Sequence, residues 1–192
     1  MTLNMRTLMA GGGSNDRTVN IQISAPASFQ GQTVIQNHSQ MLGLGGNTYI
    51  QVDGTRETVY GSTSDVTTGG TATTVNSPPL VMDSGLAPGQ SETFSYTSTT
   101  SYAGTPVPIT ASSIAYTQTR RFEGFETVTV PAGTFVDACK WSYEIAVTSP
   151  VASLTTSTLW ISRGTGITLR ILSGGSDDVL MSGTLNGRAI TP

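Results

Sequence analysis

Residues 126–145 read ETVTVPAGTFVDACKWSYEI, and this stretch decides the fold class of the chain. Two runs rich in β-branched and aromatic residues flank the turn-forming sequence Pro131-Ala132-Gly133. After the turn, large residues recur at every second position, which is the period of a strand with one buried and one solvated face. The predicted buried face comprises Phe135, Asp137, Cys139, Trp141, Tyr143, Ile145 and Val147.

The composition extends the β prediction to the whole chain. Only 11% of the 192 residues are charged, against about 25% in an average soluble domain. Threonine, serine, asparagine and glycine supply the polarity instead, strong helix formers are sparse, and Lys140 is the only lysine. An intracellular domain of this size usually carries more charge, so the balance favours an exported all-β protein.

Turn-forming dipeptides divide the rest of the chain into short predicted strands. Asp53-Gly54, for example, separates two β-rich runs at 48–52 and 57–60 and predicts a tight hairpin. About ten to twelve strands at this spacing predict an antiparallel β-barrel or a strongly curved sheet. Residues 39–44 are the only segment where we expect a helical turn.

The domain organisation predicted from these patterns is simple. Residues 1–17 are expected to be a flexible leader or tether, and residues 18–192 a single β domain. Residues 61–79 are low in complexity and nearly devoid of large apolar groups, so we expect a mobile loop there.

Two motifs in the second half of the chain resemble those of a known group of proteins. The sequence VTVPAGTF at 128–135 and the sequence WISRGTG at 160–166 are similar to the V-x-V-P-A-G-T-F hairpin and the W-x-x-x-G-x-G strand pair of uncharacterised bacterial envelope proteins, many of them lipoproteins. The resemblance covers about residues 78–172. It implies a β-barrel-like sheet in a periplasmic or outer-membrane-associated protein, and it carries no known catalytic residues. The run Ile161-Ser162-Arg163 departs from the Tyr-Ala-Pro that this group commonly has.

The N-terminus is similar to the end of a lipoprotein signal. Leu8-Met9-Ala10 is followed by a glycine-rich tether, and Gly11 stands where the lipidated cysteine would be. If the precursor has a cysteine there, an N-terminal lipid anchor is the only membrane attachment that we expect. The alternative is a disordered leader whose similarity to a lipoprotein signal is accidental.

Sequence motifs for catalysis, metal binding and nucleic-acid binding are missing. His38 is the only histidine, which leaves little for a multi-histidine metal site or a catalytic triad. The nine basic residues are scattered, and the one adjacent pair, Arg120-Arg121, points to opposite faces of a predicted strand and is interpreted as solvated. The lone Cys139 is interpreted as a buried, inert thiol. We expect no catalytic activity, no cofactor, no metal and no nucleic-acid partner.

The carboxylate pair Asp177-Asp178 leaves one metal alternative open. Two adjacent carboxylates and turn carbonyls are ligands that calcium accepts. A solvated turn is the simpler interpretation.

Three function classes remain after these exclusions. The first is an envelope protein that binds an apolar ligand, such as a lipid or small amphiphile, within the curved sheet. Its candidate ligand-binding residues are the predicted inward aromatics Phe94, Tyr96, Tyr116, Trp141, Tyr143 and Trp160, although the same side chains could fill a solid core. The second is a structural or interaction module that presents Thr/Ser-rich loops to an envelope protein partner. The third, a hydrolase, has the least support.

Overall fold

A computed structural model describes residues 1–41 and 44–192, and every regular element in that part of the chain is a strand. The strands are β1 (Thr2–Met9), β2 (Ser14–Phe29), β3 (Gln32–Met41), β4 (Leu44–Asp53), β5 (Arg56–Asp65), β6 (Thr71–Asp83), β7 (Ser91–Ala103), β8 (Ser112–Val130), β9 (Gly133–Ser149), β10 (Ser153–Ile161), β11 (Thr168–Ser173), β12 (Ser176–Leu185) and β13 (Arg188–Ala189). In the described residues, no helix is long and apolar enough to cross a membrane.

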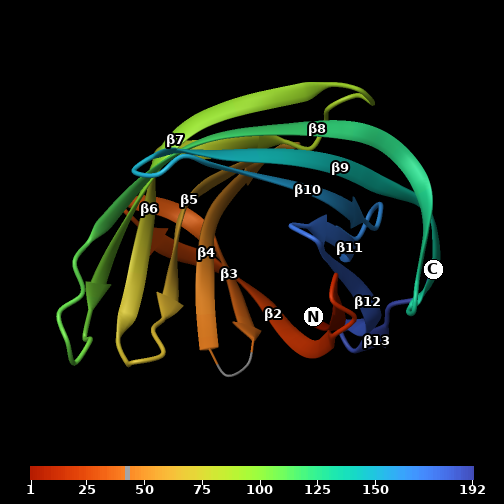
Figure 1. Cartoon of the computed structure of the whole chain (residues 1–192), viewed down its shortest axis with the longest axis horizontal. Coiled ribbons are helices and arrows are strands. Elements are labelled where there is room, and N and C mark those ends of the chain that lie inside the picture. Colours follow the sequence, from red (N-terminus) through yellow and green to blue (C-terminus); the bar gives the residue numbers. More distant parts are fainter. Residues whose placement is uncertain (42–43) are drawn as a thin grey trace.

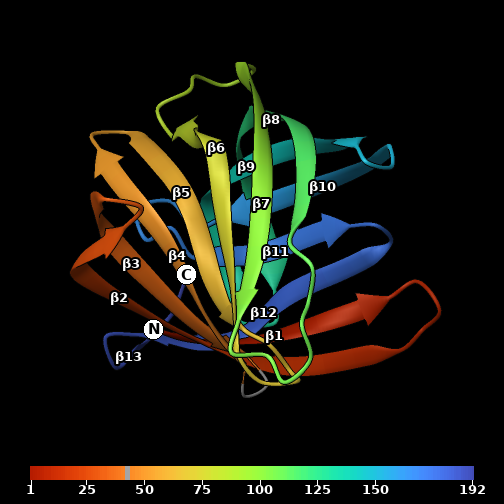
Figure 2. The same ribbon diagram turned by 90° about the vertical axis from the view of Figure 1, so that its left-hand side faces the viewer.

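The strands form one closed antiparallel barrel. Each strand is hydrogen-bonded to the next in sequence from β1 to β13, and β1 also pairs with β12, so twelve strands close into a ring with β13 beside β12. Figures 1 and 2 show β7–β10 arching over the barrel opposite β1 and β2. Closure removes the free sheet edges that would otherwise invite pairing with other chains. The predicted antiparallel barrel is confirmed.

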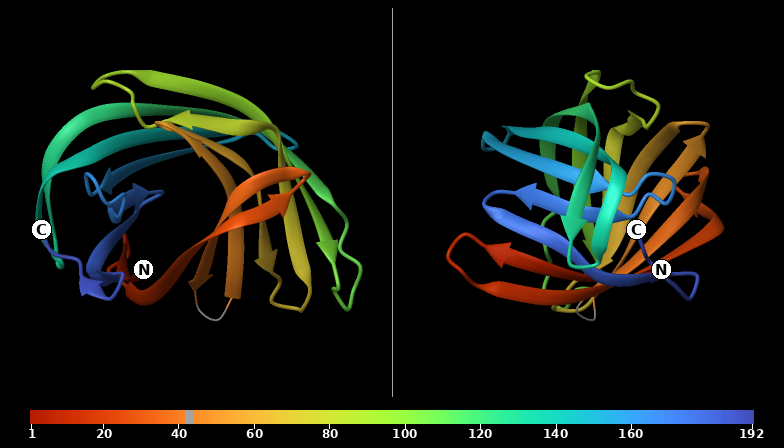
Figure 3. Two further views of the ribbon diagram at one scale, coloured as in Figure 1. Left: turned by 180° about the vertical axis from the view of Figure 1, so that it is seen from behind. Right: turned by 90° about the vertical axis from the view of Figure 1, so that its right-hand side faces the viewer.

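The β8–β9 hairpin is the longest pair of strands, and its turn end also contacts strands elsewhere in the barrel. Val130 pairs with Gly133, which leaves Pro131 and Ala132 in the turn, and Gly133 has a φ of 139°. At the turn end of this hairpin both strands bend and lie across β10–β12 (Figure 3, right). The Ala132 N–H donates a hydrogen bond of 3.1 Å to the Leu180 carbonyl, which ties the hairpin tip to β12.

The packed hydrophobic core lies where this hairpin folds back. Its buried members come from β1, β8–β12 and the turn before β11, and none of the described residues of β2–β7 belongs to it. They are Leu3, Met5, Val128, Val130, Phe135, Ala138, Trp160, Ile167, Leu169, Val179 and Leu180. The core therefore occupies one side of the barrel and leaves the rest of the ring to other contacts.

The predicted alternation along β9 is correct for Trp141 and wrong near its start. Asp137 is exposed with a φ of 55°, and it lies in a bulge opposite the segment between Glu126 and Val128. The extra residue shifts the parity, so Ala138 is fully buried instead. Trp141 is buried at 6% exposure, but it lies on the opposite face from Ala138 because three unbroken strand positions separate them. Cys139 shares the face of Trp141 and is only half-buried, so its expected full burial is wrong.

The predicted flexible leader at residues 1–17 is wrong. Residues 2–9 form β1, the strand that closes the barrel, and Leu3 and Met5 are only 5% and 4% exposed. The glycine-rich segment around Gly11 is the tight turn between β1 and β2. The short apolar segment was too small to predict a strand by itself, because its burial depends on β12 far along the chain.

The predicted mobile loop at 61–79 is also wrong. Residues up to Asp65 belong to β5 and residues from Thr71 onward to β6, so only 66–70 connect the strands. Threonine-rich strands need few large apolar groups, because backbone pairing and a pleated, half-wet surface are enough. The expected helical turn at 39–44 is strand at Ser39–Met41 and Leu44, while residues 42–43 lie outside the described residues.

Candidate functional site

Five of the six predicted aromatic residues gather on one face of β7–β9, and we name this group the aromatic wall: Phe94, Tyr96, Tyr116, Trp141 and Tyr143. Directly paired residues of antiparallel strands share a face. Tyr96 pairs with Tyr116, and their rings stack with centroids 5.3 Å apart. Phe94 pairs with Gln118, Tyr143 with Arg120, and Trp141 with Phe122.

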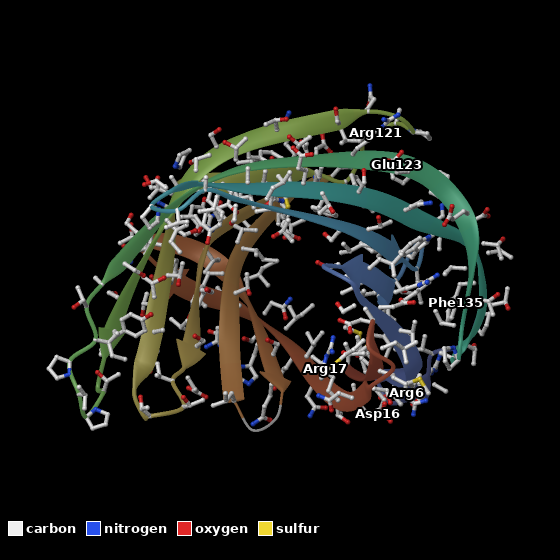
Figure 4. All side chains as sticks on the ribbon, viewed as in Figure 1. Arg6, Asp16, Arg17, Arg121, Glu123 and Phe135 are labelled. Carbon is white, nitrogen blue, oxygen red and sulfur yellow. The ribbon has the colours of Figure 1, made fainter. Side chains whose placement is uncertain are left out.

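The aromatic wall points into the barrel. On β8 the wall-side residues Gln118 and Arg120 are each 6% exposed, whereas the side chain of the intervening neighbour Arg121 is 54% exposed. Figure 4 shows Arg121 on the outer side of the arch. Tyr96 and Tyr116 are nevertheless only half-buried. Because they face inward, their remaining surface is open to the lumen, which agrees with a ring wider than the roughly eight strands that side chains can fill.

Trp160 does not belong to the aromatic wall. It pairs with Lys140 and is part of the packed core, at 5% exposure. Its indole N–H donates to the Glu126 carboxylate, and this bond, with help from Lys140, holds the pKa of Glu126 below its ordinary value. The Arg170 guanidinium lies 5.2 Å from the indole ring centroid. Trp160 therefore has a structural role, and its predicted place among inward ligand-facing aromatics is not supported by this packing.

An ion cluster around the buried Arg120 lies beside the aromatic wall, and we name it the interior ion cluster: Arg120, Glu92 and Glu57. The Arg120 Nε–H donates to Oε1 of Glu92, which also accepts the backbone N–H of Asp83 at 3.0 Å. The guanidinium carbon lies 4.7 Å from the Trp141 ring centroid. Burial raises the pKa of Glu57, while the positive charge of Arg120 opposes that rise.

This cluster was not predicted from the sequence, because Arg120 was interpreted as a solvated position. The prediction that Arg120 and Arg121 point to opposite faces is confirmed, but only Arg121 is solvated. A usable signal was present in the sequence. Arg120 shares its parity on β8 with Tyr116 and Phe122, so the aromatic positions on both sides indicated an inward face.

A second inward ion pair lies on the opposite part of the ring. Arg17 Nη2 is 2.7 Å from Asp178 Oδ2, and Arg17 also donates to the Thr7 hydroxyl. Burial alone would raise the pKa of Asp178, but the hydrogen bonds from Arg17 and Thr7 outweigh it and hold the pKa below its ordinary value. In Figure 4 Arg17 points into the barrel, while Arg6 and Asp16 lie on its outer side.

The expected solvated turn at Asp177-Asp178 is wrong. Both residues belong to β12, so their side chains point to opposite faces. Asp177 forms a two-bonded ion pair with Arg170, with N–O distances of 2.8 and 2.7 Å, and Asp178 pairs with Arg17. The described residues contain no group of three or more His, Cys, Asp or Glu side chains that could hold a metal ion.

A recess of about 660 Å³ opens beside the start of the chain, and we name it the mouth recess. Its apolar lining comprises Met1, Ile21, Ile23 and Leu185. Its polar lining comprises Thr2, Asn20, Gln22, His38, Gln40, Thr165 and Asn186. Its volume lies within the range of about 300–1,000 Å³ that is typical of small-molecule pockets.

His38 lies in β3, so the predicted polar loop around it is wrong. Its Nδ1 is 2.8 Å from Oδ1 of Asn47, which also accepts a hydrogen bond from Gln36. The Asn47 amide in turn donates to the Thr63 hydroxyl at 3.1 Å. These bonds cross β3, β4 and β5, and they orient the imidazole as part of a polar ladder.

A family model described as DUF3108-like matches residues 14–185, which covers most of the barrel. The chain belongs to the DUF3108-like family. Neither the curated proteins nor the solved structures contain a match to it. The DUF3108-like family is uncharacterised, so membership supports the predicted relationship to proteins of unknown function and supplies no ligand. The envelope location suggested by the two motifs stays a prediction.

Proposed function

We propose that this DUF3108-like barrel is a non-enzymatic protein of the bacterial envelope that binds an apolar or amphiphilic ligand in its lumen. The observation that carries the proposal is the aromatic wall. Its tyrosines face the lumen with part of their surface uncovered, and none of the aromatic wall residues belongs to the packed core. A barrel whose side chains only filled a solid interior would bury such rings.

The energetics support an amphiphile rather than a purely apolar ligand. If a ligand covered about 150 Å² of exposed aromatic surface, burial would contribute about 4 kcal/mol. That value alone corresponds to a dissociation constant of about 1 mM. Useful affinity therefore needs further contacts, including polar ones, beyond the aromatic surface itself.

The proposed envelope location rests on composition and on the two motifs. A charged fraction of 11% suits an exported chain. The alternative function is an interaction module that presents Thr/Ser-rich loops to an envelope protein partner, and the example loop at 61–79 is mostly strand. A protein partner is therefore kept as the alternative outcome of the tests below.

Titration with the neutral fluorescent probe N-phenyl-1-naphthylamine tests the proposal. We expect saturable binding at one site per chain, which weakens when Tyr96 and Tyr116 are both changed to Ala. The matched control is Tyr49→Ala, because Tyr49 stacks on Phe29 at 4.2 Å in a different part of the sheet. Loss of affinity in both variants alike, or no saturable binding, would contradict a ligand site at the aromatic wall.

A further inference from the structure

The connections between strands lie alternately at the two ends of the barrel. Each strand is antiparallel to the next one in sequence, so every second connection belongs to the same end. Figures 1 and 2 both show the β5–β6 and β7–β8 connections together at one edge of the molecule. We name this end the apolar rim. It comprises the start of β4 and the connections 10–13, 66–70, 104–111, 150–152 and 174–175, with the two residues of each strand that flank them.

Most of the large apolar side chains that are exposed in the described residues belong to the apolar rim. Val107 and Val151 are 70% and 75% exposed, and Leu154 is 62% exposed. The other exposed members are Leu8, Met9, Leu44 and Ile109. Exposed apolar residues that are scattered singly need no explanation, whereas a gathering of them marks an interaction surface.

The apolar rim has little charge that would oppose its removal from water. Among its described residues the charged side chains are Asp65 and Asp177. Asp65 accepts the backbone N–H of Gly45, and Asp177 is bound by Arg170. The connections and strand ends at the opposite end carry many more charges, namely Asp53, Arg56, Glu57, Asp83, Glu92, Arg163 and Arg188. Because an unpaired charge is costly to desolvate, the apolar rim is the end that can leave water more easily.

The β7–β8 connection extends this property to the backbone. Its sequence is GTPVPITA at 104–111, with Pro106 and Pro108 on the two sides of Val107. Both prolines are exposed and add apolar surface. Proline has no N–H, so this segment has fewer donors that would stay unsatisfied away from water.

The layout of the apolar rim favours a lipid surface over a protein partner. Its exposed apolar side chains belong to separate connections around the barrel opening rather than to one continuous patch. A stable protein interface needs a complementary surface of about 1,000 Å² or more, whereas a fluid bilayer accepts separate apolar side chains at its headgroup boundary. The described residues of the apolar rim include no Lys or Arg. Since anionic membranes attract basic clusters, this composition indicates headgroups without net charge.

We propose that the apolar rim docks the barrel on a lipid bilayer with zwitterionic headgroups, and that Val107 and Val151 enter the headgroup boundary. Docking in this way turns one opening of the barrel toward the bilayer. The proposal rests on the proposed carrier function, and it gives an amphiphile a route into the lumen that avoids bulk water.

Co-sedimentation of the full chain with sucrose-loaded phosphatidylcholine vesicles tests the docking. Burying one valine side chain changes a binding constant by about ten-fold. We therefore expect saturable binding to the vesicles, with a partition coefficient that falls at least about ten-fold when Val107 and Val151 are both changed to Asp. The matched control is Val136→Asp, because Val136 is also 70% exposed but lies near the β8–β9 turn at the opposite end. This control should bind as the unchanged chain does.

Three results would overturn the docking: no binding to the vesicles, an equal loss in Val136→Asp, or binding that appears only when anionic phosphatidylglycerol is added. A change of oligomeric state in the double variant, measured by analytical ultracentrifugation without vesicles, would instead assign the apolar rim to contacts between copies of this chain. The N-phenyl-1-naphthylamine titration without vesicles tests the carrier function separately. Retained probe binding with lost docking refutes the docking alone, and lost probe binding with retained docking refutes the carrier function alone.

Discussion

Changing Trp141 to Ala tests whether the aromatic wall is a buried interior surface. The indole is 6% exposed, its ring centroid lies 4.9 Å from that of Phe122, and the Arg120 guanidinium covers one face. Truncating a buried Trp to Ala typically costs about 3–5 kcal/mol, and a desolvated cation–π contact contributes up to about 2 kcal/mol. Lumen water can enter the space left behind and reduce the cavity cost. We therefore expect a loss of about 4 kcal/mol.

Urea unfolding followed by far-UV circular dichroism measures this loss without depending on tryptophan fluorescence. Val136→Ala is the matched control on the same strand, because Val136 is 70% exposed and should change stability by no more than about 0.5 kcal/mol. A loss below about 1 kcal/mol for Trp141→Ala, with an unchanged slope against urea, would refute the burial of this face.

Three further predictions use the same unfolding assay. Arg120→Met should cost about 3–5 kcal/mol because it leaves the Glu92 carboxylate unpaired, and adding Glu92→Gln should recover most of that loss; no recovery would contradict the pair. The pKa of Asp178 is lowered in the folded chain, so its contribution is present above the unfolded pKa and is lost as the pH falls through the folded pKa. Stability should therefore decline as the pH falls below the unfolded pKa of about 4, and less steeply in Asp178→Asn; equal slopes would count against this pair. Gly61→Ala should cost about 1–3 kcal/mol because a Cβ there collides with the backbone of β6, whereas Gly11→Ala, which has open space, should be neutral. Equal losses at the two glycines would show that the close approach at β6 is absent.

The fold class could be predicted because local signals agreed along the whole chain. Threonine-rich alternation and turn residues such as Asp53-Gly54 indicated antiparallel hairpins, and the structure has that hairpin with Asp53 paired to Arg56. Closure by β1 could not be predicted, since it depends on pairing with β12 near the other end of the chain. A run as weakly apolar as residues 2–9 gives little local indication that it lies in a sheet.

The aromatic wall could be predicted in part for the same reason. Parity within single strands placed Tyr96, Tyr116 and Tyr143 together once the strands paired in order. The alternation of inward and outward positions gives the wrong face where a bulge adds a residue, as at Asp137. The extra residue reverses the faces of the positions beyond it, whereas the alternation read from the sequence continues unchanged. Parity within β10 also cannot tell which face of that strand lines the lumen, and Trp160 lies on the face of the packed core. The burial of Arg120 was missed because a charge on a strand is usually solvated.

Native mass spectrometry of the chain, isolated from its own cells without detergent and followed by lipid extraction, tests the central claim most directly. The account predicts a discrete added mass that extracts as a lipid or another small amphiphile and that is lost when Tyr96 and Tyr116 are both changed to Ala. Bare protein, or a complex with protein alone, would contradict a lumen carrier and favour the interaction module instead.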